Sequence, residues 1–243
     1  MRGVISWNDG RSDQMGVIIE KYPNYTKPQR KMDKYTVPGR NGDILMVQDA
    51  WEDVEQKYDL IIGDGEKHSA PEYFDRLASW LCAPAGYQEL WDSFDPEHYR
   101  LAYISDQINM ESLSIGNVGR IGVVFTCKPQ KYLVSGKAEI TIETTGFKIY
   151  NPTAYSSKPI VHVTGTSGTV TVNGTIFTIT SIPSGGIYID CEEMDCYDAN
   201  GANVNSTVSS NTNEFAVLKP GENVTGFTGS ITAITITPRW FEI

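Results

Sequence analysis

A period-two alternation of apolar and polar residues in the second half of the chain constrains the fold more than any other feature. Residues 138–143 place Ile140 and Ile142 on one face of a strand and charged or hydroxyl side chains on the other. The pattern recurs in residues 160–164, 169–172, 176–179, 187–190 and 231–237. Asn173-Gly174 separates two of these segments and is a strong hairpin signal. Short strands without a helical stretch predict a β-sandwich.

Composition divides the chain near residue 133. Residues 1–133 hold 35 of the 50 charged side chains and 11 Ser or Thr, whereas residues 134–243 hold 15 charged side chains and 28 Ser or Thr. Both parts are acidic, with 15 basic against 20 acidic residues and then 5 against 10. The 243 residues also exceed the usual size of one domain, ~100–200 residues. We therefore expect two domains, 1–133 and 134–243.

The first part has a mixed pattern. Turn residues gather at Asn8-Asp9-Gly10 and in residues 37–43, where Pro-Gly and Asn-Gly predict a tight loop. The expected strands are residues 4–7, 17–20, 31–37, 44–47, 54–62, 87–91, 99–105 and 119–128. We expect these strands to form a mainly antiparallel sheet.

One helix is expected, over about residues 70–84. Ser69-Ala70-Pro71-Glu72 forms a capping box, with Ser at the N-cap and Glu three residues later. One apolar face follows at helical spacing: Tyr73, Leu77, Trp80, Leu81 and Pro84. This face requires a sheet to pack on, so the first domain is predicted to be α+β and the whole chain mainly β.

The charge of the chain argues against a nucleic-acid partner. The formal net charge is −10 and the pI is about 4.8, whereas phosphate backbones are bound by clustered Lys and Arg. The basic segment 27–31 with Lys34 is interpreted as a solvated approach to a strand, with a nucleic-acid patch as the alternative. No apolar run is long enough to span a bilayer, and the N-terminus has no signal-peptide core. We expect no membrane partner and synthesis in the cytoplasm.

The cysteines and histidines do not form a recognisable metal set. Cys82 and Cys127 are isolated, whereas Cys191 and Cys196 are a close pair that leaves a bridge or half a metal site open as alternatives. Reduced, partly buried thiols are the favoured interpretation. His68, His98 and His162 are far apart in sequence, and His162 is expected to point to solvent between two valines. No metal and no other cofactor is predicted.

No catalytic motif emerges either. Residues 63–69 resemble a phosphate-binding loop only faintly, because the glycine spacing is wrong and the loop is acidic. The densest acidic cluster is Asp190, Glu192, Glu193, Asp195 and Asp198. We interpret it as a solvated loop, with a cation site or paired catalytic acids as alternatives. A calcium loop starting at Asp198 would place Ser209 at its twelfth position, so the match is weak. The prediction is a protein that is not an enzyme.

The run of residues 35–45, Tyr-Thr-Val-Pro-Gly-Arg-Asn-Gly-Asp-Ile-Leu, resembles a segment near the start of the distal tail proteins of siphophages that infect Gram-positive bacteria. As in that family, a strand, a helix with Leu77, Trp80 and Leu81, and a strand near Tyr87 follow. Similar pieces continue in order to the end of the chain: residues 151–153, 158–160, 172–174, 187–190, 218–223 and 234–240. The family often has Gly where this chain has Thr153, which loosens that local match.

The resemblance implies a structural protein of a phage or prophage virion, located at the tail tip. An N-terminal domain would close into a hexameric ring, and a galectin-like C-terminal sandwich would project outward. The implied partners are further copies of the chain, the tail tube protein, the tail-tip, tail-fibre or receptor-binding protein, and the tape-measure path. The alternative is a carbohydrate-binding adhesin for host glycans, which would use exposed aromatics such as Tyr155, Tyr188, Tyr197 or Trp240.

Overall fold

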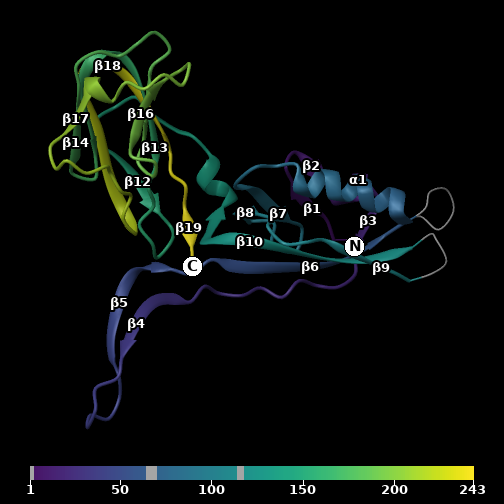
Figure 1. The fold of residues 1–243 in the computed structure, drawn as a ribbon. Coiled ribbons are helices and arrows are strands. Elements are labelled where there is room, and N and C mark those ends of the chain that lie inside the picture. The colour runs from purple at the N-terminus through teal and green to yellow at the C-terminus, as the bar shows by residue number, and fades with distance from the viewer. Residues whose placement is uncertain (1–2, 64–69, 114–117) are drawn as a thin grey trace. The chain divides into compact units, whose positions relative to one another are not determined.

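The computed structural model describes residues 3–63, 70–113 and 118–243. It consists of two compact units (Figure 1). Unit 1 contains the described residues up to Lys131 together with Ile243, and unit 2 contains Tyr132–Glu242.

Unit 1 is built on an antiparallel sheet with the strand order β2-β1-β7-β8-β10-β6-β3, and β9 also pairs with β10. The bounds are β1 Ile5–Trp7, β2 Gly10–Arg11, β3 Val17–Ile19, β6 Val54–Ile62, β7 Gln88–Asp92, β8 His98–Tyr103, β9 Asn109–Ser112 and β10 Gly119–Leu133, with a 3-10 turn at Ser12–Met15. The short strands at its ends therefore cover the long central ones only in part.

One helix, α1 (Ala70–Cys82), covers one face of this sheet (Figure 1). Its buried residues Leu77, Trp80 and Leu81 pack with the inward-facing residues of the strands in a single core cluster. The indole of Trp80 donates to the Trp7 carbonyl at 2.8 Å, and the indole of Trp7 donates to the Leu81 carbonyl at 3.2 Å. Both indole donors are therefore satisfied inside the core.

Most of the predicted elements of unit 1 are confirmed among the described residues, including the strand over residues 54–62 and the helix. The predicted N-cap Ser69 and the loop 64–69 with His68 lie outside the described residues. The helix ends at Cys82 instead of residue 84. Asn8 and Asp9 have φ values of 44° and 58° and turn β1 back onto the two-residue β2, whereas β3 pairs with β6. Strand β9 was not predicted.

A separate two-stranded hairpin, the arm, is formed by β4 (Arg30–Tyr35) and β5 (Ile44–Trp51). Figure 1 shows it extending away from the sheet of unit 1. Residues 20–29 lead into it along β6, and β5 continues into β6 after two residues. The predicted strands 31–37 and 44–47 are both present, but β5 is longer than expected.

Unit 2 is a sandwich made from one curled antiparallel sheet. Two long strands, β13 (Ile160–Val172) and β18 (Gly221–Thr237), belong to both layers and pair along the whole of β13 with residues 225–237 of β18. One layer has the order β11-β18-β13-β15-β16 and the other β12-β18-β13-β14-β17. The remaining bounds are β11 Ile140–Ile142, β12 Phe147–Asn151, β14 Thr175–Ile179, β15 Ile187–Asp190, β16 Asp195–Asp198, β17 Val208–Ser210 and β19 Phe241–Glu242, with 3-10 turns at Val134–Lys137 and Asn205–Thr207.

The two layers share their long strands because glycines permit a sharp bend. The register shifts between Thr164 and Gly168, and Gly165 and Gly168 adopt φ values of 140° and 154°. A Cβ at Gly165 would lie 2.3 Å from the Ser230 carbonyl oxygen, so no other residue fits without movement. Sequence periodicity predicted two separate strands here, and the structure has one bent strand. Residues from both layers form one core cluster.

The hairpin predicted at Asn173-Gly174 is confirmed, with φ values of 49° and 90°. The mainly β architecture is likewise confirmed. Cys127, Cys191 and Cys196 are buried, Cys82 is exposed, and all four are unbridged. Among the described residues, no helix is long and apolar enough to cross a membrane.

Candidate functional site

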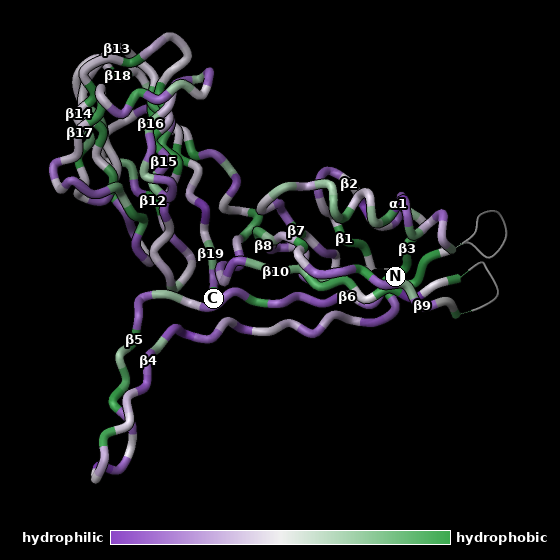
Figure 2. Tube along the Cα trace, in the orientation of Figure 1, coloured by the Kyte–Doolittle hydropathy of each residue, from purple (hydrophilic) through white to green (hydrophobic). Residues whose placement is uncertain are grey.

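The arm exposes large apolar side chains on both of its faces. Cross-strand partners share a face, so Met32, Leu45 and Val47 lie on one side and Tyr35, Ile44 and Met46 on the other. Leu45, Met46 and Val47 are 53%, 58% and 54% exposed. Figure 2 shows the apolar colouring on β5 far from the sheet of unit 1.

Such a hairpin is not expected to be stable without a partner surface. An isolated two-stranded hairpin is marginal in water, and contiguous exposed apolar side chains mark interaction sites. The arm has charged neighbours as well, since Lys34 faces Leu45 and Asp33 faces Met46 across the strands. The two apolar faces indicate burial on both sides, as in a wedge between two protein surfaces.

The tip of the arm is the Pro-Gly-Arg-x-Gly segment that was predicted to be a tight loop. Gly39 and Gly42 adopt φ values of 80° and 81°, which glycine reaches without strain. The hydroxyl of Thr36 donates to Asp43 Oδ1 at 2.8 Å, and the Arg40 N–H donates to the Val37 carbonyl at 3.1 Å. The loop is therefore closed on itself.

The basic segment 27–31 lies at the base of the arm. Arg30 stacks over the Trp51 ring at 4.8 Å, and Lys27 Nζ donates to the Ile243 main-chain oxygen at 2.6 Å. Two of the basic side chains in this segment therefore have partners within the chain. The segment leads into β4, in agreement with the prediction that it approaches a strand.

Strand β6 has an open edge along its first half. Its partner β3 covers only Leu60–Ile62, and the Glu20 N–H donates to the Asp59 carbonyl at 2.8 Å. Backbone groups alternate in direction along a strand, so the N–H and C=O groups of Lys57 and Glu55 point to the same side as those of Asp59. No described strand pairs with them there. An unpaired edge of this kind is a template for another strand.

A groove of about 490 Å³ runs along this edge. One wall is the start of β6 with Glu52 and Asp53, and the other is the extended segment from Asn24 to Gln29. The Gln56 amide donates to the Asn24 carbonyl at 3.3 Å and the Glu52 N–H to the Gln29 carbonyl at 2.8 Å, which join the two walls.

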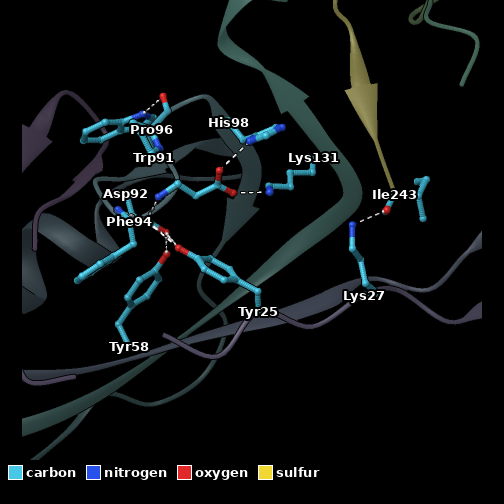
Figure 3. A network of polar contacts seen from close by, with 11 residues as sticks. Tyr25, Lys27, Tyr58, Trp91, Asp92, Phe94, Pro96, His98, Lys131 and Ile243 are labelled. Atoms are coloured by element: carbon cyan, nitrogen blue, oxygen red, sulfur yellow. Dashed lines mark hydrogen bonds and ion pairs between the residues drawn. The ribbon is translucent and has the colours of Figure 1, made fainter. Parts of the chain in front are cut away.

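A buried polar network holds the segment that leads into the arm (Figure 3). The hydroxyls of Tyr58 and Tyr25 donate to the Asp92 carboxylate at 2.6 and 2.9 Å. Asp92 also accepts the N–H groups of Phe94 and Asp95. Burial and the Asp92 charge raise the pKa of both tyrosines, so their hydroxyls stay protonated and keep donating.

The network continues to Asp95, which pairs with His98 Nδ1 at 2.7 Å and with Lys131. Burial alone raises the pKa of Asp95, but Lys131 and His98 outweigh it and hold the pKa below the usual value. A cavity of about 20 Å³ lies here, lined also by Gln56 and Arg100. Its size suits water and excludes an organic substrate.

The acidic cluster of unit 2 is the turn between β15 and β16, and its first carboxylates are neutralised internally. Arg239 Nη2 lies 2.6 Å from Asp190 Oδ2, and Arg239 Nη1 donates to Glu192 at 3.2 Å. Asp190 also accepts the N–H groups of Glu192 and Glu193. Asp190 and Arg239 are largely buried, so the pair is structural in character.

The later members of the cluster cap their own loop. Asp195 accepts the side-chain amides of Asn203 and Asn205 at 2.7 and 2.6 Å. Asp198 accepts the N–H groups of Asn200 and Ala202, and those hydrogen bonds lower its pKa. In the part of the chain that the structure describes, no group of three or more His, Cys, Asp or Glu could hold a metal ion.

Two of the four aromatics proposed as sugar platforms, Tyr188 and Trp240, have no free ring face. Trp240 is a core residue and does not present the exposed ring that the carbohydrate-binding alternative requires. Tyr188 has His162 stacked on one side at 4.2 Å and Tyr197 on the other at 5.4 Å, so both of its faces are covered. His162 is half-buried in this stack and not simply directed to solvent. Tyr155 stacks on Phe241 at 5.7 Å.

Sequence patterns did not reveal the open edge of β6 or the Asp92 network. Both depend on which strands become neighbours and on where β3 ends, and neither leaves a local motif. The apolar run Ile44–Val47 was visible, but its exposure was not.

Comparison with known proteins gives matches in structure only. No protein-family model matches the chain, and no curated protein sequence matches it. The Dit protein of phage SPP1, described as a paradigm of the hub adsorption apparatus in phages that infect Gram-positive bacteria, superposes with a TM-score of 0.74. The match covers 97% of this chain and 98% of that one at 13% identity.

Two further matches are chains of the phage P2 baseplate in its activated conformation. The Ca form has a TM-score of 0.55 at 9% identity, covering 97% of this chain and 96% of that one. The Sr form has a TM-score of 0.53 at 9% identity, covering 96% and 97%. The resemblance to phage distal tail proteins is thus confirmed at the level of the fold, over nearly the whole chain.

Proposed function

We propose that this chain is a structural distal tail protein of a phage or prophage, which forms a hexameric ring between the tail tube and the tail-tip or receptor-binding proteins. The observation that carries the proposal is the match of both units, in order, to the SPP1 Dit hub protein. Baseplate chains of phage P2 support it further.

The arm supports the assembly part of this proposal. A hairpin with apolar residues on both faces loses exposed area only when other proteins cover it on two sides. A ring subunit meets a neighbour on each flank and further proteins above and below, so it offers such a junction. The arm is inserted at this junction. In an isolated monomer its two apolar faces stay exposed to water.

The open edge of β6 supplies the second contact. A strand from a neighbouring copy that enters the groove beside Glu55 and Lys57 would pair with their free backbone groups. The contact is heterologous, because it joins an edge to a different surface of the next copy. Heterologous contacts form a ring when the rotation from one copy to the next closes after a whole number of copies.

The acidity of the chain suits a channel that DNA passes through. With a net charge of −10, the subunit repels phosphate on average and does not retain it. The proposed hub therefore guides the path of the tape measure and the DNA without binding nucleic acid itself.

Light scattering and negative-stain imaging of the purified chain test the proposal. Six copies of the 27.0 kDa chain give a particle of about 162 kDa with a central hole. Antibodies raised against the chain should also label virions at the tail end away from the capsid. A monomer at every concentration, together with virions that lack the chain, contradicts the proposal.

The carbohydrate-binding alternative loses two of its four candidate aromatics. Sugar platforms need an exposed aromatic face, whereas Tyr188 is covered on both sides and Trp240 is buried. Hydrolysis is likewise disfavoured, since Asp190 and Glu192 are engaged by Arg239.

A further inference from the structure

Unit 2 contains a pocket that ring assembly does not explain. Its volume is about 360 Å³, within the range of ~300–1,000 Å³ that is usual for ligand sites. It opens between Cys196 on β16 and Phe177 and Val208 on β14 and β17. Strands β16 and β17 are the outermost strands of the two layers on the side beyond β13, so the pocket opens at the edge of the sandwich core.

The deep part of this pocket is apolar. Phe177 and Cys196 are buried, and Phe215 packs on Phe177 with ring centroids 6.0 Å apart. Two of the polar residues in the lining already have partners. Asn205 donates to Asp195 and accepts from the Cys196 N–H, and the Ser210 hydroxyl donates to the Glu214 carbonyl. The part formed by Phe177, Phe215 and Cys196 therefore suits an apolar group, and Ser209, Asn213 and Glu214 supply the polar part of the lining.

Met194 lies at the rim of the pocket, with an exposed apolar side chain and an unfavourable backbone conformation. Its side chain lines the pocket, yet the residue is 64% exposed. Its φ of 54° lies in the left-handed region, which residues other than Gly, Asn and Asp rarely adopt. Backbone strain at an exposed position often marks a binding surface. A partner that covers the Met194 side chain would remove its exposed apolar area from water.

The rim is acidic. Glu214 lines the pocket and Glu193 precedes Met194 in the turn, and both are exposed. Among the described residues neither carboxylate has an ion-pair partner, in contrast to Glu192. A basic group on a ligand can therefore pair with either of them.

We propose that this pocket docks a partner polypeptide through one large apolar side chain that has Lys or Arg beside it. The apolar side chain fills the space against Phe177 and Phe215, and the basic group pairs with Glu214 or Glu193. This is a protein-binding site on unit 2, separate from the arm and the β6 edge that are proposed to build the ring.

Selection of random displayed peptides on the full chain tests the proposal. Enriched peptides should share Trp, Phe, Leu or Met next to Lys or Arg. Ser209→Trp fills the mouth and should weaken binding at least about thirtyfold, as expected for loss of a central anchor. Glu214→Gln should weaken it about two- to fivefold, because a rim ion pair contributes little.

Thr141→Trp is the matched control, since it places the same indole on β11, an edge strand outside the pocket. It should change peptide binding less than about twofold. If Ser209→Trp lowers the unfolding temperature substantially, Met194→Ala replaces it; this exposed change should weaken binding about fivefold.

Several results overturn the proposal: no enrichment above the uncoated surface, peptides that bind Ser209→Trp as tightly as the parent, or displacement by a glycan. Self-association that Ser209→Trp abolishes would identify a second copy of the chain as the occupant and also overturn it. The test does not depend on a ring, because unit 2 carries the pocket whatever the oligomeric state.

Discussion

The two units belong to the same structural class. They differ in how far residues within each unit neutralise its charges and cover its apolar side chains. Both are β-rich and each has five more acidic than basic residues. Unit 2 uses its charged turn residues internally, through Arg239 and the amides around Asp195. Unit 1 leaves an apolar arm in solvent and an unpaired strand edge on its sheet. The contrast fits the proposal that assembly covers the arm of unit 1, whereas the charged turn of unit 2 needs no partner to be neutralised.

The largest effect is expected from charged residues introduced on the arm, because they test whether unit 1 needs a partner to cover its apolar side chains. In one variant Leu45→Asp and Val47→Asp alter one face, and in another Ile44→Asp and Met46→Asp alter the other. Each should weaken ring formation roughly a hundredfold or more, because a partner would have to bury a carboxylate. The unfolding free energy of the monomer should change by less than about 0.5 kcal/mol. Light scattering and urea unfolding measure the two effects.

Thr178→Asp, an exposed position on β14 of unit 2, is the control and should leave the ring intact. If only one of the two arm variants affects assembly, the arm contacts a single protein surface, and the inference that it lies between two surfaces is wrong. If neither does, the arm is not an assembly element.

Arg239→Ala should show the opposite behaviour. Removing Arg239 leaves Asp190 and Glu192 without their cation in a largely buried place, which should cost about 3–5 kcal/mol of unfolding free energy. The ring should persist at temperatures where the variant is folded. Lys148→Ala is the matched control, because its ion pair with Glu222 is exposed and should contribute less than about 1 kcal/mol.

Tyr58→Phe and Tyr25→Phe separate the stability of unit 1 from the order of the segment that leads into its arm. The buried Tyr58 hydroxyl donates to Asp92, so its removal should cost about 1–2 kcal/mol. Tyr25→Phe should cost less than about 1 kcal/mol but should increase amide exchange at Glu52, whose N–H bonds to Gln29 beside the arm. Equal effects on both measurements would show that the network does not hold the arm in particular.

The smallest effect is expected from acid. The folded-state pKa of Asp95 is held below the unfolded value, ~3.9, by Lys131 and His98. Its contribution to stability is therefore present above about pH 4 and is lost as the pH falls through the folded pKa. Asp95→Asn should flatten the decline of unfolding free energy below about pH 4, by less than about 1 kcal/mol. An unchanged acid profile would show that Asp95 is not stabilised by these partners.

A strand, helix or turn was predictable where the residues at a few nearby positions are enough to specify it. The alternation of Val54–Ile62, the spacing of Leu77, Trp80 and Leu81, and the Asn173-Gly174 turn each gave the right element. Predictions failed where pairing with a distant strand decided how far a strand extends. Residues 160–164 and 169–172 look like two strands because Gly165 and Gly168 interrupt the pattern, yet β18 pairs with both and makes them one.

The order of motifs along the chain also indicated the fold family. That order could not locate the surfaces on which the proposed function depends. Tyr25, Tyr58 and Asp92 carry no shared spacing. They come from the segment before the arm, from β6 and from β7, which are neighbours neither in the sequence nor in the strand order.

The amino-acid sequence by itself determined most of the strands, the helix and the acidic charge, because these follow from periodicity, backbone preference and composition over short distances. Only the tertiary structure decided which apolar residues stay in solvent, which strand edge stays unpaired, and which carboxylates are neutralised. Those properties depend on neighbours that are distant along the chain, and a residue such as Leu45 is chemically the same in a core or on an exposed arm.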